Sequence, residues 1–328
     1  MGKVLSTGYA ELYEEFLAYE KPRVTPATFY TQRSLVYRVI KWFEEADVPL
    51  ETAAIQDVLR YKEEISGQVT AAGKPFTAGT VNQHLVMARV LFQYLVESGL
   101  RLSNPMQEVP LLREPFRVCR NYLTETQMFR LLTKLMHFDE APDMQGKRRR
   151  YRVHVIAEVL YATGLRQHEL VTVEERHINL DERTIFIPCG KGALSRTVFL
   201  TGFAAEVLKR YLTKGRAAAV TGYKTKDHVE RVFGSWLGDA VQLELRRLCR
   251  ELELPVITCH GFRHSLGTHL LRAGCDIRHI QVLIGHHNIN STTTYTHLDK
   301  DDLKKSLDTY HPRNSFCKIA NSLGDTPC

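Results

Sequence analysis

Three prolines within eleven residues interrupt the helical pattern of the chain. The stretch "SNPMQEVPLLREPFR" contains Pro105, Pro110 and Pro115 and has no helical period. Proline lacks an amide hydrogen and disfavours helical geometry in the residue before it, so a helix does not continue through this stretch. We therefore expect an extended connection between two domains, which also suits a chain of 328 residues. The expected ranges are 1–110 for the first domain, 111–120 for the linker, 121–311 for the second domain and 312–328 for a flexible tail.

The first domain carries four helical patterns. Apolar residues recur at three- and four-residue steps in each of them. The patterns cover residues 9–19, 29–46, 51–65 and 77–99. Gly99 lies where a helix commonly ends with a residue in the left-handed conformation. Four helices of this length predict a small helical bundle.

The second domain is predicted to be mostly helical with one β insert. Thr124 and Gln127 have the spacing of a capping box, which marks the start of a helix. "RTIFIPCGKGALSRTVFLT" (183–201) contains two β-branched runs joined by Gly-Lys-Gly, the pattern of a β-hairpin. Further helices are expected in "VHVIAEVLYATG", "HGFRHSLGTHLLRAG", "CDIRHIQVLIG" and "KDDLKKSLDTYH". The fold class is therefore mainly α with a small β-hairpin insert (α+β).

A basic run, "GKRRRYR" (146–152), directly precedes one of these predicted helices. Two interpretations fit it equally well. It is either a solvated loop or a contact to phosphate groups.

The amino-acid composition limits the kinds of partner that we expect for this chain. The chain has 44 Lys and Arg against 37 Asp and Glu, a formal charge of +7, which permits a polyanionic partner without requiring one. No run of eighteen apolar residues occurs and the first twenty residues lack a signal-peptide pattern, so we expect no membrane partner. Seven scattered cysteines without a C-x-x-C pair argue against a disulfide framework or zinc ribbon and predict a cytoplasmic protein.

Six side chains could together act on a phosphodiester. They are Arg166 in "TGLRQHEL", Lys191 in the hairpin turn, His260 and Arg263 in "HGFRH", His286 after Gly285, and Tyr295 in "STTTYTH". Glu169, three residues after Arg166, could support that arginine. Taken singly, each residue has an ordinary structural interpretation, such as a surface ion pair, a solvated lysine or a packed tyrosine. Only the combination of these residues favours a catalytic function.

The combination suits attack on a DNA phosphate. Two guanidinium groups can each bind two phosphate oxygens, as in a bidentate fork. Histidines can donate hydrogen bonds or accept a proton, and a lysine can protonate a leaving hydroxyl. A phenol has a pKa of about 10, so it needs nearby cations and a base to react near neutral pH. The predicted cluster would supply both to Tyr295.

These motifs resemble the tyrosine recombinase (phage integrase) family. The resemblance is carried by "TGLRQHEL", the hairpin "GKG", "HGFRHSLGTHLLRAG", "IQVLIGHHNINSTTTYTH" and the "HP" after the last predicted helix. It is strongest to Xer-type recombinases and to integrases of transposons and other mobile elements. "TVNQHLVMARVLFQYLVESG" with the following "SNP" is similar to the amino-terminal core-binding domain of that family.

The resemblance implies a role for each position. Tyr295 would attack the phosphate and form a 3′-phosphotyrosyl link. Arg166 and Arg263 would hold the phosphate, and Glu169 would support Arg166. Lys191 would act as general acid. His260 would serve in proton transfer, and His286 would donate a hydrogen bond to the phosphate.

The resemblance also implies partners. The substrate would be a double-stranded DNA recombination site, cleaved without metal, ATP or another cofactor. Exchange of two duplexes requires four cleavages, so we expect a homo-oligomer, a tetramer on DNA, with possible accessory proteins. The helix in "KDDLKKSLDTYH" would pack either against a neighbouring protomer or on its own domain.

Three alternatives remain. The first is a catalytically silent DNA-binding protein of the same fold, against which the intact set of six residues argues. The second is a metallohydrolase built on histidines, but "HGFRH" lacks the glutamate of H-E-x-x-H. The third is a type IB topoisomerase, which the Xer-like amino-terminal domain disfavours.

Overall fold

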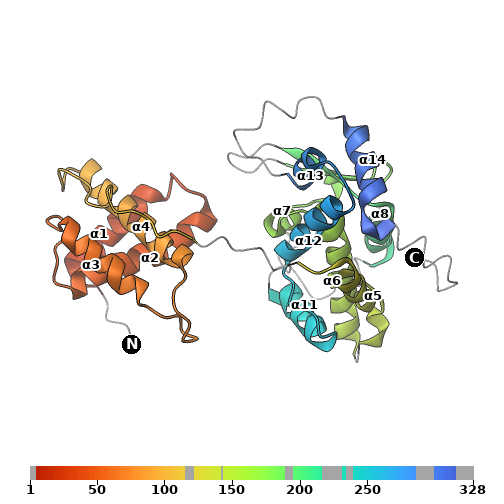
Figure 1. Cartoon of the computed structure of the whole chain (residues 1–328), viewed down its shortest axis with the longest axis horizontal. Coiled ribbons are helices and arrows are strands. Elements are labelled where there is room, and N and C mark those ends of the chain that lie inside the picture. The colour runs from red at the N-terminus through yellow and green to blue at the C-terminus, as the bar shows by residue number, and fades with distance from the viewer. Residues whose placement is uncertain are drawn as a thin grey trace. The chain divides into compact units, whose positions relative to one another are not determined.

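The computed structural model describes residues 5–114, 122–141, 143–188, 195–215, 231–233, 239–285 and 299–314. The chain divides into two compact units, Met1–Val118 and Cys119–Cys328, and each is described by itself (Figure 1). Within the described part, no helix combines the length and apolar character that crossing a membrane requires. The mainly helical fold with a small antiparallel sheet confirms the predicted fold class.

Unit 1 is a bundle of four helices. They are α1 (Thr7–Glu20), α2 (Pro26–Glu45), α3 (Ile55–Ser66) and α4 (Ala78–Glu97). Thr25 and Thr77 cap α2 and α4, because the hydroxyl of each accepts a hydrogen bond from a backbone N–H in the first helical turn. Gly99, just beyond α4, has a φ of 74°, as its position predicts. Buried aromatic and aliphatic side chains of all four helices form one core.

Two boundaries of unit 1 differ from the expectation. The third helix begins at Ile55 rather than residue 51, because the chain turns at Pro49 and Asp57 then caps the helix by accepting from the Ala54 amide at 2.8 Å. The predicted linker begins too early at residue 111. The side chain of Asn82 on α4 binds both the amide and the carbonyl of Leu112, which keeps this part of the chain on unit 1.

Unit 2 is built around one long helix. Its helices are α5 (Glu125–Met136), α6 (Met144–Thr163), α7 (Gln167–Val171), α8 (Gly202–Arg210), α11 (Asp239–Glu251), α12 (Cys259–Arg272), α13 (Ile277–Ile284) and α14 (Lys300–Tyr310), with short turns η1 (Phe138–Glu140), η2 (Glu175–His177) and η3 (Tyr211–Gly215). Helix α6 contacts α5, α8, α11 and α12. The capping box of Thr124 and Gln127 at the start of α5 is confirmed.

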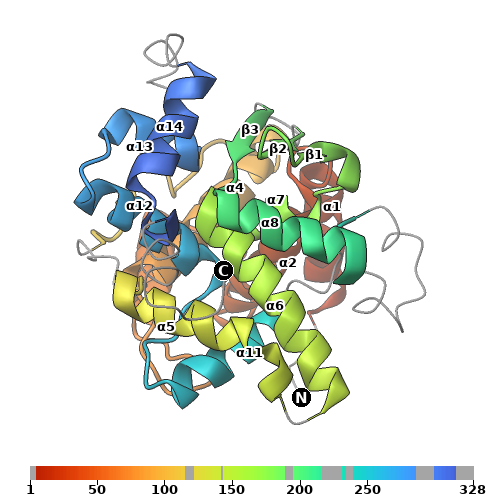
Figure 2. The same cartoon turned by 90° about the vertical axis from the view of Figure 1, so that its right-hand side faces the viewer.

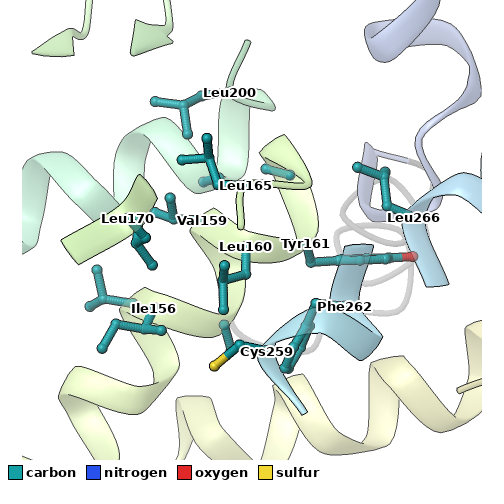
Figure 3. Close-up of a cluster of buried hydrophobic side chains, with 14 of the residues drawn as sticks. Ile156, Val159, Leu160, Tyr161, Leu165, Leu170, Leu200, Cys259, Phe262 and Leu266 are labelled. Atoms are coloured by element: carbon teal, nitrogen blue, oxygen red, sulfur yellow. The ribbon is translucent and has the colours of Figure 1, made fainter. Parts of the chain in front are cut away.

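The core of unit 2 joins α6 to α12. Figure 3 shows Cys259 and Phe262 of α12 beside Leu160 and Tyr161 of α6, all at most 2% exposed. The Tyr161 hydroxyl lies 2.8 Å from Nδ1 of His269, whose Nε2 lies 2.9 Å from the Leu123 carbonyl. A carbonyl accepts only, so Nε2 of His269 donates to it. Burial lowers the pKa of His269, which favours a neutral ring that accepts the tyrosine proton at Nδ1. The buried polar groups therefore fix α12 against α6 and the start of the unit.

The predicted β-hairpin is confirmed. Strands β1 (Ile178–Asn179), β2 (Thr184–Ile187) and β3 (Arg196–Phe199) form an antiparallel sheet in the order β1-β2-β3. Ile185 and Val198 pair across the hairpin and are both buried in the unit core. Figures 1 and 2 show the strands at the same end of unit 2 as α13 and α14, and β3 contacts α13.

The basic run 146–152 is helical, so the interpretation of it as a solvated loop is wrong. It forms the first turns of α6, which begins at Met144 and is capped by Asp143. Arg150 is 3% exposed, and both Arg149 and Arg150 lie within 3.6 Å of the buried Glu244 carboxylate on α11. A lone buried carboxylate is costly, so these arginines serve to pair it within the protein.

The predicted tail, 312–328, is described as far as residue 314, and its first residues pack in unit 2. Pro312 and Arg313 are buried, and Arg313 binds the buried Glu158 with Nε and Nη2 at 3.3 and 2.8 Å. Its guanidinium also lies 3.9 Å from the centre of the Phe203 ring. The apolar face of α14, with Leu303 and Leu307, packs in the core of its own unit. Of the two arrangements considered for that helix, the described residues adopt packing on its own domain.

We predict that Arg313→Met lowers the free energy of unfolding of unit 2 by about 3 kcal/mol, because it leaves the Glu158 carboxylate buried without its cation. Urea denaturation of the full chain measures the change. The matched control is Arg183→Met, which removes a similarly bidentate but partly exposed pair with Asp308 and should cost about 1 kcal/mol or less. Equal losses in the two variants would contradict a structural role for Arg313.

Candidate active site

Arg166 lies at the junction between α6 and α7. Its backbone is extended, and its amide donates to Oε2 of Glu169 at 2.7 Å, so the glutamate caps α7. Its Nη1 also donates to Oε1 of Glu169 at 3.3 Å. The Arg166 side chain is 39% exposed, whereas that of Glu169 is 9% exposed. Glu169 therefore holds one edge of the guanidinium while the rest of the group stays accessible.

Arg263 approaches the same place from α12. It is 3% exposed, and its Nη1 donates to the Gly164 carbonyl at 2.7 Å. Its Nη2 is buried and has no hydrogen-bond partner among the described residues. An unpaired donor on a buried cation is unfavourable. The guanidinium thus retains one donor without an acceptor among the described residues.

Gly164 allows α6, α12 and α13 to meet at this site. It ends α6 with a φ of 63°, a conformation that disfavours other residues. A Cβ atom there would lie 2.9 Å from Cγ2 of Ile284 and 3.1 Å from Cδ2 of Leu266. Both the backbone and the available space therefore require glycine. The close approach brings the carbonyl that receives Arg263 to the end of α13.

The charges of this region do not balance. The positive groups that act on one another are Arg166, Arg196 and Arg263, and the carboxylate among them is that of Glu169. Burial, and then the charges of Arg166 and Arg196, lower the pKa of Arg263 to about 10. Burial alone would raise the pKa of Glu169, but hydrogen bonds and charge from Arg196 and Arg166 lower it overall. Among the described residues, three guanidinium groups therefore act on one carboxylate here, which leaves an excess of positive charge.

Two histidines on α12 border the arginines. The ring centres of His260 and His264 are 4.4 Å apart and the rings are perpendicular. Partial desolvation, followed by the charges of His264, Arg263 and Arg166, lowers the pKa of His260. Desolvation and Arg263 lower the pKa of His264. Both rings are therefore mainly neutral at pH 7 and able to accept a proton.

The structure brings four of the predicted residues together. Arg166, Glu169, His260 and Arg263 act on one another through hydrogen bonds or charge. The other three predicted residues, Lys191, His286 and Tyr295, lie outside the described residues.

Sequence reasoning missed Arg196. Its Nη1 and Nη2 donate to the two oxygens of Glu169 at 2.6 and 2.8 Å. The available signal was weak, because an arginine at the start of a strand is usually a solvated residue. Its position five residues after Lys191, in the same hairpin, was the only hint.

The predicted site residues do not line the larger of two cavities in unit 2. Arg263 and His264 line an open groove of about 300 Å³ between α12 and α13. A larger cavity of about 720 Å³, between α6 and α8, contains none of the predicted residues.

Comparison with known proteins defines the class. The sequence profile of the phage integrase family matches residues 121–302. The tyrosine recombinase XerC of Bacillus pumilus is 32% identical over 80% of this chain and 89% of its own length. A tyrosine recombinase XerD of Ralstonia nicotianae is 28% identical over 76% of this chain and 79% of its own length. The chain therefore belongs to the phage integrase family and is a tyrosine site-specific recombinase.

Solved structures share the fold. The XerH site-specific recombinase bound to a difH substrate aligns with a TM-score of 0.64 and 16% identity, covering 90% of this chain and 96% of its own. The Tn1549 transposon integrase in complex with circular intermediate DNA aligns with a TM-score of 0.62 and 18% identity, covering 91% and 98%. At these identities the likeness concerns the fold.

We predict that His264→Phe raises the pKa of His260, because it keeps an aromatic ring in place and removes one of the charges that disfavour a protonated His260. NMR titration of the histidine ring protons measures both values. In the unchanged protein the pKa of His260 should lie below 6.5. His137→Phe is the control, since His137 is not among the groups acting on His260. An unchanged pKa in His264→Phe would contradict the coupling.

Proposed function

We propose that this chain cleaves and rejoins DNA at a recombination site through a covalent 3′-phosphotyrosyl link to Tyr295. The observation that carries the proposal is the buried Arg263 guanidinium with an unpaired Nη2. It lies beside Arg166, whose guanidinium is partly exposed. An excess of positive charge with an open donor suits a phosphate, whose oxygens accept bidentate hydrogen bonds.

In the proposed reaction, the phosphodiester bond is exchanged for a phosphotyrosyl bond. The Tyr295 oxygen attacks the phosphorus, its proton passes to the neutral His260, and the bond from phosphorus to the 5′ oxygen breaks. Lys191 protonates that oxygen and releases a 5′-hydroxyl. Arg166, Arg263 and His286 stabilise the charge that develops on the phosphate oxygens. Religation is the reverse, with another 5′-hydroxyl as the nucleophile.

The chemistry has no need of ATP or a metal ion. One phosphodiester is replaced by another, so the energy of the bond is kept in the phosphotyrosyl link. Guanidinium groups take the charge-stabilising part that a divalent cation has in many phosphoryl-transfer sites. The lowered pKa of His260 suits a proton acceptor near neutral pH.

The proposal includes an assembly. Exchange of two duplexes needs four cleavages and one tyrosine for each, so four protomers would act together on DNA, with accessory proteins where the site requires them. Unit 1 would be the core-binding domain and unit 2 the catalytic domain. The buried cysteines Cys249, Cys259 and Cys275 are free thiols, as expected for action in the reducing cytoplasm.

A catalytically silent DNA-binding protein of the same fold is the second candidate. It would use the same arginines to hold DNA without cleaving it. The intact set of Arg166, Lys191, His260, Arg263, His286 and Tyr295 in the sequence favours the catalytic candidate.

We predict that Tyr295→Phe abolishes covalent attachment to DNA, because phenylalanine keeps the ring and removes the nucleophilic oxygen. The substrate is a nicked duplex carrying a candidate site, incubated in EDTA and analysed on denaturing gels. Tyr310→Phe, a change on the partly buried end of α14, is the matched control and should form the adduct at the normal rate. An adduct in Tyr295→Phe would exclude this nucleophile. Tight binding without an adduct in the unchanged protein would favour the silent alternative, and an adduct that requires a metal would favour a metal-dependent enzyme.

We predict that Arg263→Lys lowers the cleavage rate by about 100-fold, because lysine cannot both bind the Gly164 carbonyl and donate to the phosphate as a fork. DNA affinity should change by less than about threefold, since many phosphate contacts share it. Single-turnover cleavage and a binding titration separate the two. The control Arg130→Lys makes the same change on α5, where Arg130 binds the Leu252 carbonyl. Equal losses in rate and affinity would show a binding role only.

A further inference from the structure

Arg196 is a third guanidinium group at the site, outside the set of six. Its side chain is 14% exposed, and its two terminal nitrogens bind the two oxygens of Glu169 at 2.6 and 2.8 Å. The same carboxylate caps α7 and holds Arg166. Whatever fixes the Glu169 carboxylate therefore also fixes Arg166.

Arg196 is also the first residue of β3. It pairs with Ile187 in the last register position of the β2–β3 ladder before the hairpin turn. Lys191 belongs to that turn in the sequence. The bond to Glu169 thus anchors the base of the hairpin to the start of α7.

A third contact joins Arg196 to the end of α13. Gly285 ends that helix with a φ of 69°, and a Cβ atom there would lie 2.6 Å from Nε and 2.9 Å from Cζ of Arg196. Only a residue without a side chain leaves room for the guanidinium. His286 is the next residue in the sequence.

We propose that Arg196 is a positioning residue, which aligns Arg166 with the base of the β2–β3 hairpin and the end of α13 through one guanidinium group bound to Glu169 and packed on Gly285. The inference rests on the proposed function. Arg196 acts through Glu169, because both of its terminal nitrogens donate to that carboxylate and its side chain is 14% exposed. Its Nε is buried and has no hydrogen-bond partner among the described residues.

The role requires arginine. A planar fork binds both carboxylate oxygens and fixes the rotation of the carboxylate, whereas an ammonium group binds as a single point. Lysine at this position would keep the positive charge and release the carboxylate to rotate. Small displacements of a positioning group lower catalysis far more than binding.

Arg196→Lys tests the proposal in the full-length protein on the nicked duplex. We expect the single-turnover cleavage rate to fall by about 10-fold to 100-fold, with DNA affinity within about threefold of the unchanged protein. The matched control, Arg183→Lys, makes the same change in a bidentate pair with Asp308 and should cleave normally. A normal rate in Arg196→Lys would overturn the proposal.

Two further measurements separate positioning from simple stability. The loss in Arg196→Lys should not add to the loss in Glu169→Gln when the two are combined, because both act through the same carboxylate. Removing the Arg196 hydrogen bond also raises the pKa of Glu169, which NMR titration of that carboxyl should detect in Arg196→Lys. Additive losses with an unchanged pKa of Glu169 would overturn the proposal.

The proposed function and the positioning role fail in different ways. If neither the unchanged protein nor Arg183→Lys forms an adduct, the proposed function is wrong and this inference with it. If both form the adduct and Arg196→Lys does so equally fast, only the positioning role is wrong. Should Arg196→Lys not fold, Glu169→Gln keeps the side-chain shape, and normal cleavage by that variant would overturn the proposal.

Discussion

The carboxylate of Glu169 is the interaction on which the site of unit 2 depends. It caps α7 through the Arg166 amide, contacts the Arg166 side chain and receives both terminal nitrogens of Arg196. A carboxylate that is 9% exposed is stable only with such partners, and in turn it holds two cations close together. The same ionic group thus completes a helix, joins that helix to the sheet and prepares a surface for an anion.

Two glycines make this arrangement possible, because neighbouring groups occupy the space that a side chain would need. Gly164 lets the end of α6 approach Ile284 and Leu266, and Gly285 lets the end of α13 approach the Arg196 guanidinium. Both have positive φ values, so each ends its helix and changes the chain direction where the helices converge. The apolar contacts of α6 and α12 behind them provide the rigid support that positions charged groups accurately (Figure 3).

The buried arginines of unit 2 differ in the groups that they bind. Arg313 and Arg150 are buried against Glu158 and Glu244, and these pairs serve the packing of α6. Arg263 is equally buried, yet the acceptor that it binds is the uncharged Gly164 carbonyl. Arg313 and Arg150 each have a carboxylate partner, whereas Arg263 has no carboxylate bound directly to it among the described residues.

Residue type and spacing predict the class of fold, the family and the four site residues that the described structure brings together. Helical periods, the capping box at Thr124, the hairpin pattern and the motifs around Arg166 and Arg263 are local features, which residue type and spacing express directly. Three pairings could be seen only in the folded chain. They are those of Arg149 and Arg150 with Glu244, of Arg313 with Glu158, and of Arg196 with Glu169. Each of these arginines meets a carboxylate distant in sequence or on another element. From sequence alone, a charged residue is predicted to be solvated. Only the fold shows which opposite charge it contacts and whether water is excluded from the pair.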